Sequence, residues 1–392
     1  MRHEVQVELI EQLRADEAPG QKFAQTQIPV ELYRDDARLQ RELTVLFRGR
    51  PQPVAHVSEV AHAGDYVTAS VADMPILVVR DQAGALRGFV NVCRHRGAPL
   101  AHKTAGQCKA FVCPYHGWVY QLDGGLRHVP GEAFFPDIDK STLGLVPLST
   151  ISAHGFVWVV PEADILAHPG RGAPAESPAT FDLDEALGQV GDDFRHFGMA
   201  EHHLYRKSVS VRQCNWKLIV DAFLEGYHLQ TLHRDSLYRF FGGGRRVLVE
   251  FFGANVRSVG GRKNIDEEAE KPRSEWNIRA CATPFYLVFP STVVVVHPDF
   301  ISLLAVVPMT VDRTMCTHYL LTPAPATDEK QERHYAKSFE LIDGVVFQNE
   351  DLAIAESIQR GLSSHAYEHF VLGSAEYPIR AFHDNIARAL ER

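Results

Sequence analysis

The sequence of 392 residues lacks the features that mark membrane, nucleic-acid-binding and disulfide-rich proteins. Its best apolar runs, TVVVV and ISLLAVV, have the length of a strand and are far too short to span a membrane. The formal net charge of -9 leaves no basic excess for nucleic acid. Six cysteines are too few for a disulfide framework in so long a chain, and the start, MRHEVQVELIEQL, does not resemble a signal peptide. We therefore expect a cytoplasmic protein.

The first part of the chain changes from a helical to a β pattern. Residues 1–48 predict a helical segment, because Val5, Leu9 and Leu13 recur at helical spacing. Residues 49–165 contain short β-rich runs such as PILVVR, GWVYQL and GFVWVV, separated by turn sequences such as DQAG and DGG. This pattern predicts a small antiparallel β domain, with the helical segment packed on the domain that follows.

Residues 166–392 predict a second, larger domain. The stretch 161–180 is rich in Pro, Gly and Ala and is expected to be a linker. The elements predicted beyond it are strands at 201–212 and 278–322 and helices at 215–231 and 329–361. Strands mixed with two well-marked helices favour an α+β fold, in which helices cover an antiparallel sheet.

Two cysteine–histidine pairs lie in the predicted β domain, each at the tip of a hairpin: Cys93 with His95 in FVNVCRHRG, and Cys113 with His116 in FVCPYHGW. A structural zinc site is one interpretation of such a set. Zinc sites usually take ligands from C-x-x-C knuckles, whereas here each pair joins one cysteine to one histidine. The pattern therefore favours a Rieske [2Fe–2S] cluster, in which two thiolates bind one iron and two imidazoles bind the other.

A second set of possible metal ligands lies in the larger domain. His228 is followed five residues later by His233. Two histidines and a carboxylate form the facial triad that binds Fe(II) in oxygenases and leaves positions open for O2. The long predicted helix offers Asp351, on or beside its apolar stripe, with Glu350 as the nearest competitor. A polar helix face and a solvated acid pair are the alternatives to a metal site. The stripe consists of Phe339, Ile342, Val346, Ile354 and Ile358.

These motifs resemble a known family. CRHRG with CPYHGW is similar to the Rieske domain of the aromatic-ring-hydroxylating oxygenases, the α subunits of Rieske non-haem iron oxygenases, and the resemblance runs from about residue 27 onward. EDLAIAESIQRG is similar to the segment that holds their third iron ligand. The ligands implied are Cys93, His95, Cys113 and His116 for the [2Fe–2S] cluster and His228, His233 and Asp351 for a mononuclear Fe(II).

The resemblance also implies roles for two carboxylates. In the family, an acidic residue three positions before the first iron histidine bridges to a Rieske histidine of the neighbouring subunit. Glu225 matches that position and His116 is the matching Rieske residue, which implies a head-to-tail homotrimer. Asp221 lies one turn earlier, where relatives place polar residues near the iron, and it is expected to support the site.

The residue after the second cluster loop bears on the reduction potential. Trp118 follows Gly117 where respiratory-chain Rieske proteins, which share the pattern, usually place serine. A hydroxyl that bonds to a cluster sulfur raises the potential. The lack of this hydroxyl predicts a potential toward the low end of the Rieske range.

Together these expectations describe an oxygenase component that uses O2 to hydroxylate a small aromatic substrate, as in aromatic-hydrocarbon catabolism. The chain has no dinucleotide-binding or P-loop motif, so the resemblance implies a separate flavin and iron–sulfur reductase, with or without a ferredoxin, fed by NAD(P)H. Oxidative demethylation or C–N cleavage of a quaternary amine is the alternative. An electron carrier without oxygenase activity and a zinc-stabilised binding protein are further alternatives.

Several apolar side chains could line a substrate pocket, although core packing is the other role open to most of them. They are Phe223, Leu224, Leu229, Leu232, Tyr238, Phe240, Phe241, Phe285 and Phe289. In the nearby sequence FFGGGRRV, Arg245 or Arg246 could meet a substrate carboxylate or face solvent.

Overall fold

The structure is a computed structural model, which describes residues 1–15, 24–161, 181–241 and 247–391. The predicted linker lies outside these ranges apart from its first residue, as do Arg245 and Arg246. Within the described ranges every helix is too short or too polar to cross a lipid bilayer.

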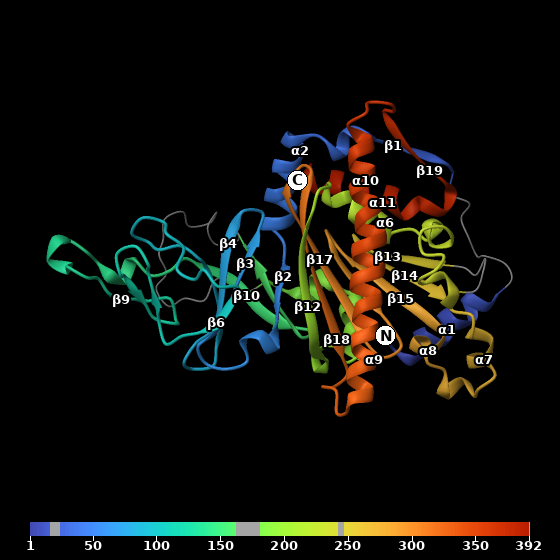
Figure 1. The fold of residues 1–392 in the computed structure, drawn as a ribbon, viewed down its shortest axis with the longest axis horizontal. Helices are drawn as coiled ribbons and strands as arrows, with labels where there is room; N and C mark the ends of the chain where they lie inside the picture. Colours follow the sequence, from blue (N-terminus) through green and yellow to red (C-terminus); the bar gives the residue numbers. More distant parts are fainter. Residues whose placement is uncertain (16–23, 162–180, 242–246, 392) are drawn as a thin grey trace. The chain divides into compact units, whose positions relative to one another are not determined.

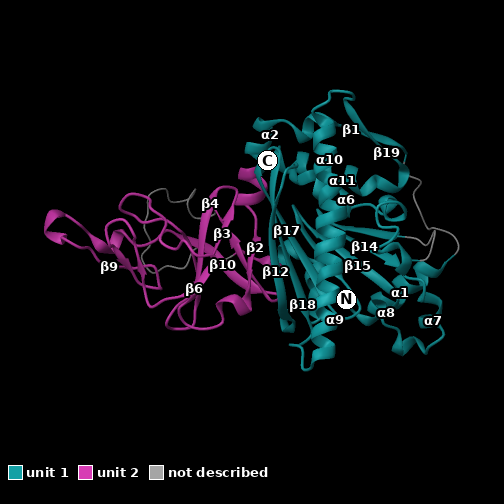
Figure 2. Cartoon of the chain, in the orientation of Figure 1, with its two compact units in different colours: residues 1–42, 184–392 teal, residues 43–183 magenta. Residues whose placement is uncertain are grey.

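The chain divides into two compact units, shown in Figure 2. One consists of residues 1–42 and 184–392, and the other of residues 43–183. The N-terminal segment thus belongs to the same unit as the C-terminal half of the chain. The divisions after residues 42 and 183 lie six and eighteen residues from the boundaries expected after residues 48 and 165.

The unit of residues 43–183 contains two antiparallel sheets, which share one hydrophobic core with Phe89, Trp118 and Tyr120. The seven-stranded sheet has the order β2-β11-β10-β5-β4-β3-β6. Its strands are β2 (Gln52–His56), β3 (Asp65–Val71), β4 (Met74–Arg80), β5 (Leu86–Val90), β6 (Ala105–Gln107), β10 (Pro147–Ala153) and β11 (Phe156–Val160). The three-stranded sheet contains β7 (Phe111–Val112), β8 (Val119–Tyr120) and β9 (Leu126–His128).

The larger unit is built on a seven-stranded antiparallel sheet in the order β12-β18-β17-β16-β15-β14-β13. Its strands are β12 (His203–Arg212), β13 (Val247–Phe252), β14 (Asn255–Gly261), β15 (Ala282–Val288), β16 (Thr292–Val296), β17 (Ile301–Thr310) and β18 (Arg313–Thr322). β17 is buried from Ile301 through Pro308, and Figure 1 shows α9 and α10 lying over one side of the sheet. The expected α+β fold is confirmed.

The helices of this unit carry several of the side chains that form the candidate sites. They are α1 (His3–Arg14), α2 (Asp36–Glu42), α5 (Gln189–His196), α6 (Trp216–Phe223), α7 (Ile265–Ala269), α8 (Ile278–Cys281), α9 (Glu329–Phe339), η10 (Glu340–Asp351), α10 (Leu352–Leu362) and α11 (Tyr377–Leu390). The short helix α4 (Leu183–Leu187) begins at the division between the units. Because α8 precedes β15, the strand region predicted from residue 278 begins with a helical turn.

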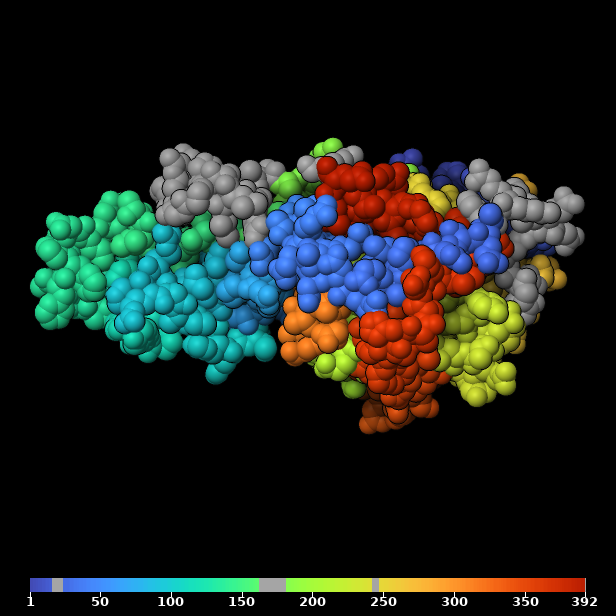
Figure 3. Space-filling view, turned by 90° about the horizontal axis from the view of Figure 1, so that it is seen from above, coloured from blue at the N-terminus to red at the C-terminus, as the bar shows by residue number. Residues whose placement is uncertain are grey.

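The N-terminal segment is only partly helical, so the prediction for residues 1–48 is wrong in one stretch. Thr26–Pro29 forms β1, which pairs antiparallel with β19 (His369–Leu372) near the end of the chain. Ile28 is buried by this pairing. In Figure 3 the blue N-terminal segment and the red C-terminal segment lie side by side. The strand depends on a partner far away in sequence, which local periodicity does not reveal.

The helix predicted at 215–231 is also shorter than expected. α6 ends at Phe223, and a separate 3-10 turn, η7 (Tyr227–Gln230), follows. Gly226 interrupts the helix, and the Glu225 carboxylate accepts the backbone N–H groups of Tyr227 and His228, which caps the new turn. Asp221, Glu225 and His228 therefore do not lie on one continuous helix.

The long helix predicted at 329–361 is present as α9, η10 and α10 in succession, but η10 is a π-helix. Ile342 and Val346 are buried as predicted, whereas Ile354 and Ile358 are 41% and 36% exposed. A π-turn closes its hydrogen bonds from residue i to i+5 and so shifts the following residues around the helix axis. The stripe read at 3.6 residues per turn is wrong beyond the π segment for this reason.

Candidate metal centres

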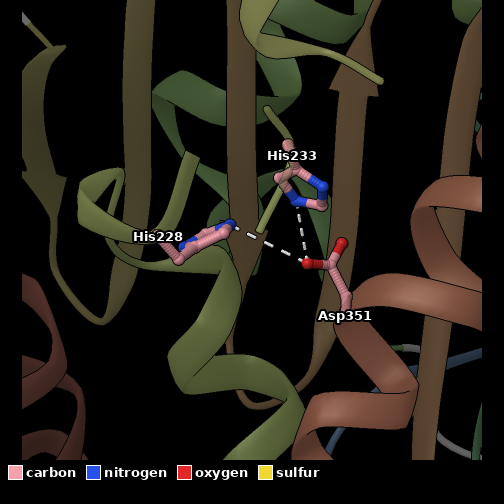
Figure 4. A group of neighbouring side chains, drawn as sticks. All are labelled: His228, His233 and Asp351. Atoms are coloured by element: carbon pink, nitrogen blue, oxygen red, sulfur yellow. Dashed lines mark ion pairs between the residues drawn. The ribbon is translucent and has the colours of Figure 1, made fainter. Parts of the chain in front are cut away.

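The first candidate centre gathers His228, His233 and Asp351, shown in Figure 4. One ligand atom of each lies within 4.8 Å of those of the other two. Asp351 Oδ1 is 3.0 Å from His233 Nε2 and 3.8 Å from His228 Nε2. Asp351 Oδ1 is buried and accepts no hydrogen bond from the described residues. A carboxylate oxygen that is buried without a donor and faces two imidazole nitrogens suits a divalent cation.

Each of the two histidines is held by a second carboxylate through its other nitrogen. His233 Nδ1 donates to Glu350 Oε2 at 2.7 Å, and His228 Nδ1 donates to Glu225 Oε1 at 2.5 Å. Glu350 also accepts the Ser236 hydroxyl at 2.7 Å. Both Nε2 atoms are thereby left for a metal ion, as in many carboxylate–histidine–metal sites.

These contacts distinguish Asp351 from Glu350, the two acids that the sequence offers as the third metal ligand. The Asp351 carboxylate approaches the Nε2 atom of His233, whereas the Glu350 carboxylate binds its Nδ1 atom. Burial lowers the pKa of His233, but Asp351 and Glu350 outweigh this effect and raise the pKa above its ordinary value. The two carboxylates create a negative potential at the ring. This potential stabilises positive charge there and so also favours a bound cation.

Asp221 has different neighbours. Its Oδ2 accepts the Tyr33 hydroxyl at 2.6 Å, and its Oδ1 lies 3.1 Å from His383 Nε2. Burial, and then Asp221, raise the pKa of Tyr33 well above its ordinary value, so the hydroxyl remains a donor. In the part of the chain that the structure describes, Asp221 contacts neither His228 nor His233. The structure thus places it in a buried network that joins α6 to the N-terminal segment and α11.

The second candidate centre lies on two loops with the same backbone pattern. Gly97 N donates to Cys93 O at 2.9 Å, and Gly117 N donates to Cys113 O at 3.0 Å. Both glycines have positive φ, 75° and 73°, which other residues adopt only with strain. Two equivalent turns therefore present the two cysteine–histidine pairs to one another.

The side chains of these loops converge. Cys93 and Cys113 are buried, and the Nδ1 atoms of His95 and His116 lie 3.0 Å apart. Two imidazole nitrogens this close, on one side of two buried thiols, fit a Rieske cluster, in which one iron takes two histidines and the other takes two cysteines. The Trp118 ring stacks on His95, with centroids 4.9 Å apart and planes 9° apart, and so fixes its orientation.

Tyr120 is a contributor to this centre that the sequence analysis missed. Its hydroxyl lies 3.3 Å from Cys93 Sγ and accepts the backbone N–H of Arg94 at 2.9 Å, which leaves its own proton free for the sulfur. Burial, and then the contact with Cys93, raise the pKa of Tyr120, so the proton is retained. A hydroxyl on a cluster thiolate favours the reduced cluster and opposes the low potential expected from Trp118.

A cavity of about 500 Å³ adjoins His228, His233 and Asp351. Its wall is largely apolar and takes side chains from α6, η10 and strands of the large sheet. The predicted pocket residues that line it are Phe223, Leu224, Leu229, Phe240, Phe241 and Phe285. Leu232, Tyr238 and Phe289 are not among the lining residues. Sequence reasoning missed Arg262, Thr283 and His297 in the wall, because isolated polar residues at strand ends give no local signal.

Both units match known family models. Residues 50–139 match the Rieske [2Fe-2S] domain, and residues 196–392, half of the chain, match the ring hydroxylating alpha subunit (catalytic domain). The two matches place the cysteine–histidine loops in the first domain and His228, His233 and Asp351 in the second.

Individual relatives extend over different shares of the chain. The carnitine monooxygenase oxygenase subunit of Escherichia coli is 28% identical over 93% of this chain and 94% of that protein. The glycine betaine monooxygenase oxygenase subunit of Chromohalobacter salexigens is 31% identical, and the match spans 54% of this chain but only 44% of that relative. A solved quaternary ammonium Rieske monooxygenase has a TM-score of 0.78 at 22% identity, and the likeness covers 94% of this chain and 96% of that one. The structural likeness shows a shared fold.

Proposed function

Because the chain belongs to the ring-hydroxylating α-subunit family of Rieske non-haem iron oxygenases, we propose that the two candidate centres hold the two iron groups of that family. His228, His233 and Asp351 bind the mononuclear Fe(II). The ligands of the [2Fe–2S] cluster are Cys93, His95, Cys113 and His116. The proposal rests chiefly on one observation: the unbonded Asp351 Oδ1 meets two Nε2 atoms at the wall of a cavity.

The iron groups, when bound, supply electrons and activate O2 for attack on a C–H bond. The chain itself orients the ligands. Glu350 fixes the ring plane of His233, and Glu225 fixes that of His228, so that these two rings and Asp351 would hold an iron ion that could still bind O2. The apolar wall of the cavity limits the water around the reacting carbon.

Glu225 is the proposed point of electron entry. Its carboxylate already binds His228, and the adjacent Tyr227 is 77% exposed, so this corner of the unit is open to a second protein surface. On the cluster side, His116 is exposed. We propose that His116 of one subunit meets Glu225 of the next in a homotrimer, and that a separate reductase, with or without a ferredoxin, reduces the cluster.

We propose a quaternary amine as the leading substrate class. The relatives quoted above act on carnitine and glycine betaine, and one of them aligns over almost the whole chain. The cavity presents the faces and edges of Phe223, Phe285 and Phe347, which can bind an alkylammonium group by cation–π contact. Hydroxylation of an aromatic ring, the function expected first from the sequence, is the second candidate, because the same side chains also accept a flat apolar ring.

The test uses the iron-loaded, cluster-loaded protein with an NADH-fed surrogate reductase. Oxygen uptake and product formation are measured with L-carnitine, glycine betaine, choline, naphthalene and benzoate. We expect substrate-dependent O2 uptake with at least one quaternary amine. Chelation of the mononuclear iron should abolish it while the EPR signal of the reduced cluster persists. If O2 uptake with that amine survives complete removal of this iron, the proposed assignment of the triad is wrong.

A further inference from the structure

The cavity has one basic corner, formed by Arg262, Thr283 and His297, which we treat as a unit. Thr283 lies on β15 opposite Gly260 of β14, while Arg262 directly follows β14 and His297 directly follows β16. The three residues therefore come from neighbouring strand ends at one edge of the cavity wall. No role in holding iron requires a positive charge at this place.

Among the residues that the structure describes, the guanidinium of Arg262 has no carboxylate partner in an ion pair. Its Nε donates to Thr283 Oγ1 at 3.0 Å, and the described residues offer no ion pair to its two Nη atoms. Burial lowers the pKa of Arg262, and the attraction of the Asp299 carboxylate, which is itself bound to His334, opposes this shift. A half-buried guanidinium without an ion pair is unfavourable, so a ligand that supplies a carboxylate would be bound more strongly here than in water.

The surroundings of Arg262 strengthen this imbalance. Arg279 donates its Nε to His297 O at 2.8 Å and likewise forms no ion pair with the described residues. His297 is 8% exposed, and its Nε2 has no hydrogen-bond partner among them. Burial, and then Arg262, hold the pKa of His297 well below its ordinary value, so the ring is a neutral donor or acceptor. Asp299 attracts both arginines, but among the described residues neither of them forms an ion pair with it.

We infer that the basic corner binds a carboxylate of the substrate, so that the substrate is a small organic acid. The two Nη–H groups of Arg262 offer the fork that a carboxylate accepts. Thr283 Oγ1 accepts from Arg262 Nε, which leaves the threonine hydroxyl proton for the same ligand. The inference rests on the proposed function: a quaternary amine substrate is then a zwitterion rather than an amino alcohol, and an aromatic substrate is an aromatic acid.

The test compares matched probes that differ only in the anionic group. Glycine betaine is compared with choline, and benzoate with benzyl alcohol, by titration calorimetry on the anaerobic holoenzyme up to about 10 mM probe. We expect the acid of at least one pair to bind about 10- to 100-fold more tightly than its alcohol. Arg262→Gln should remove that preference, and Arg262→Lys, which keeps the charge but loses the fork, should retain only part of it.

Arg279→Gln is the matched control, because it removes the same charge next to His297 from outside the cavity wall. It should leave the preference within about threefold of the wild type. The inference is overturned if neither acid binds, if both alcohols bind as tightly as the acids, or if Arg279→Gln lowers the preference as much as Arg262→Gln. Iron content and the cluster EPR signal are measured on each sample, so a failure of the iron assignment is seen separately from a failure of the anion site.

Discussion

The hydrogen bond from His233 to Glu350 offers the sharpest test of how the iron site is held. Glu350→Gln keeps the size of the side chain and an oxygen that can still accept from His233 Nδ1, but it removes the negative charge behind the ring. Partners of this kind change metal affinity by about 10- to 100-fold, which corresponds to roughly 1.4–2.8 kcal/mol. We expect the mononuclear iron to dissociate more readily by that factor.

Two further variants calibrate this expectation. Glu350→Ala also removes the acceptor for both His233 and Ser236, so the loss should reach the upper end of the range or exceed it. Ser236→Ala removes only a neutral hydroxyl from Glu350 and should cost about 0.5–1.5 kcal/mol, which is tenfold or less. The order of iron affinity should therefore be wild type, Ser236→Ala, Glu350→Gln, Glu350→Ala.

The assay is an anaerobic Fe(II) titration against a competing chelator, with the Rieske cluster already in place. The EPR signal of the reduced cluster reports that the other domain is unchanged, and circular dichroism reports the fold. If Glu350→Gln bound iron as tightly as the wild type, Glu350 would have no part in the site. If Asp351→Asn had no effect while Glu350→Gln abolished binding, the two acids would have to exchange roles.

Three other predictions test separate parts of the molecule. Tyr120→Phe removes the hydroxyl near Cys93 Sγ and should lower the reduction potential of the cluster by about 20–60 mV, measured by redox titration; an unchanged potential would show that the contact does not reach the cluster. Glu225→Gln should weaken iron binding no more than Glu350→Gln does, so samples reloaded to one mononuclear iron per chain should show turnover lowered by about 100-fold or more while the reductase still reduces the cluster at the normal rate; normal turnover in such samples would remove the proposed bridge. Glu42→Gln leaves the buried Lys217 ammonium without its carboxylate, whose oxygens lie 2.6 and 2.9 Å away, and should lower the free energy of unfolding by about 3 kcal/mol or more; a change below about 1 kcal/mol in urea unfolding would contradict this.

The proposed cysteine and histidine ligands could be predicted from the sequence because each set lies within a short stretch of the chain. Cys93 with His95, and Cys113 with His116, stand within short loops, so their spacing alone indicates the cluster. The geometry adds that His95 and His116 meet through their Nδ1 atoms. His228 and His233 could also be predicted as metal ligands from their spacing, because η7 and the residues directly after it carry both.

The parts that sequence reasoning missed depend on distant contacts or on irregular backbone. The Tyr120 hydroxyl reaches Cys93 only in the folded chain, where β8 lies against the first cysteine–histidine loop. β1 forms only because β19 pairs with it. The helix at 215–231 was overextended because a helical pattern does not show that Glu225 caps the next turn. The sequence does not show which acid faces Nε2 of His233 and which faces Nδ1, because this depends on the direction in which each carboxylate points.

The π segment that ends at Asp351 makes the iron site sensitive to the length of the chain as well as to its composition. A single residue inserted between Glu340 and Asn349 would turn every later side chain by about 100° relative to the earlier ones, unless a further widened turn absorbed it. Glu350 and Asp351 would then face new neighbours even though both acids were still encoded. Two adjacent carboxylates serve opposite nitrogens of the His233 ring only in the present register of the helix, so a lengthened variant should fold around an intact sheet and yet fail to retain its iron.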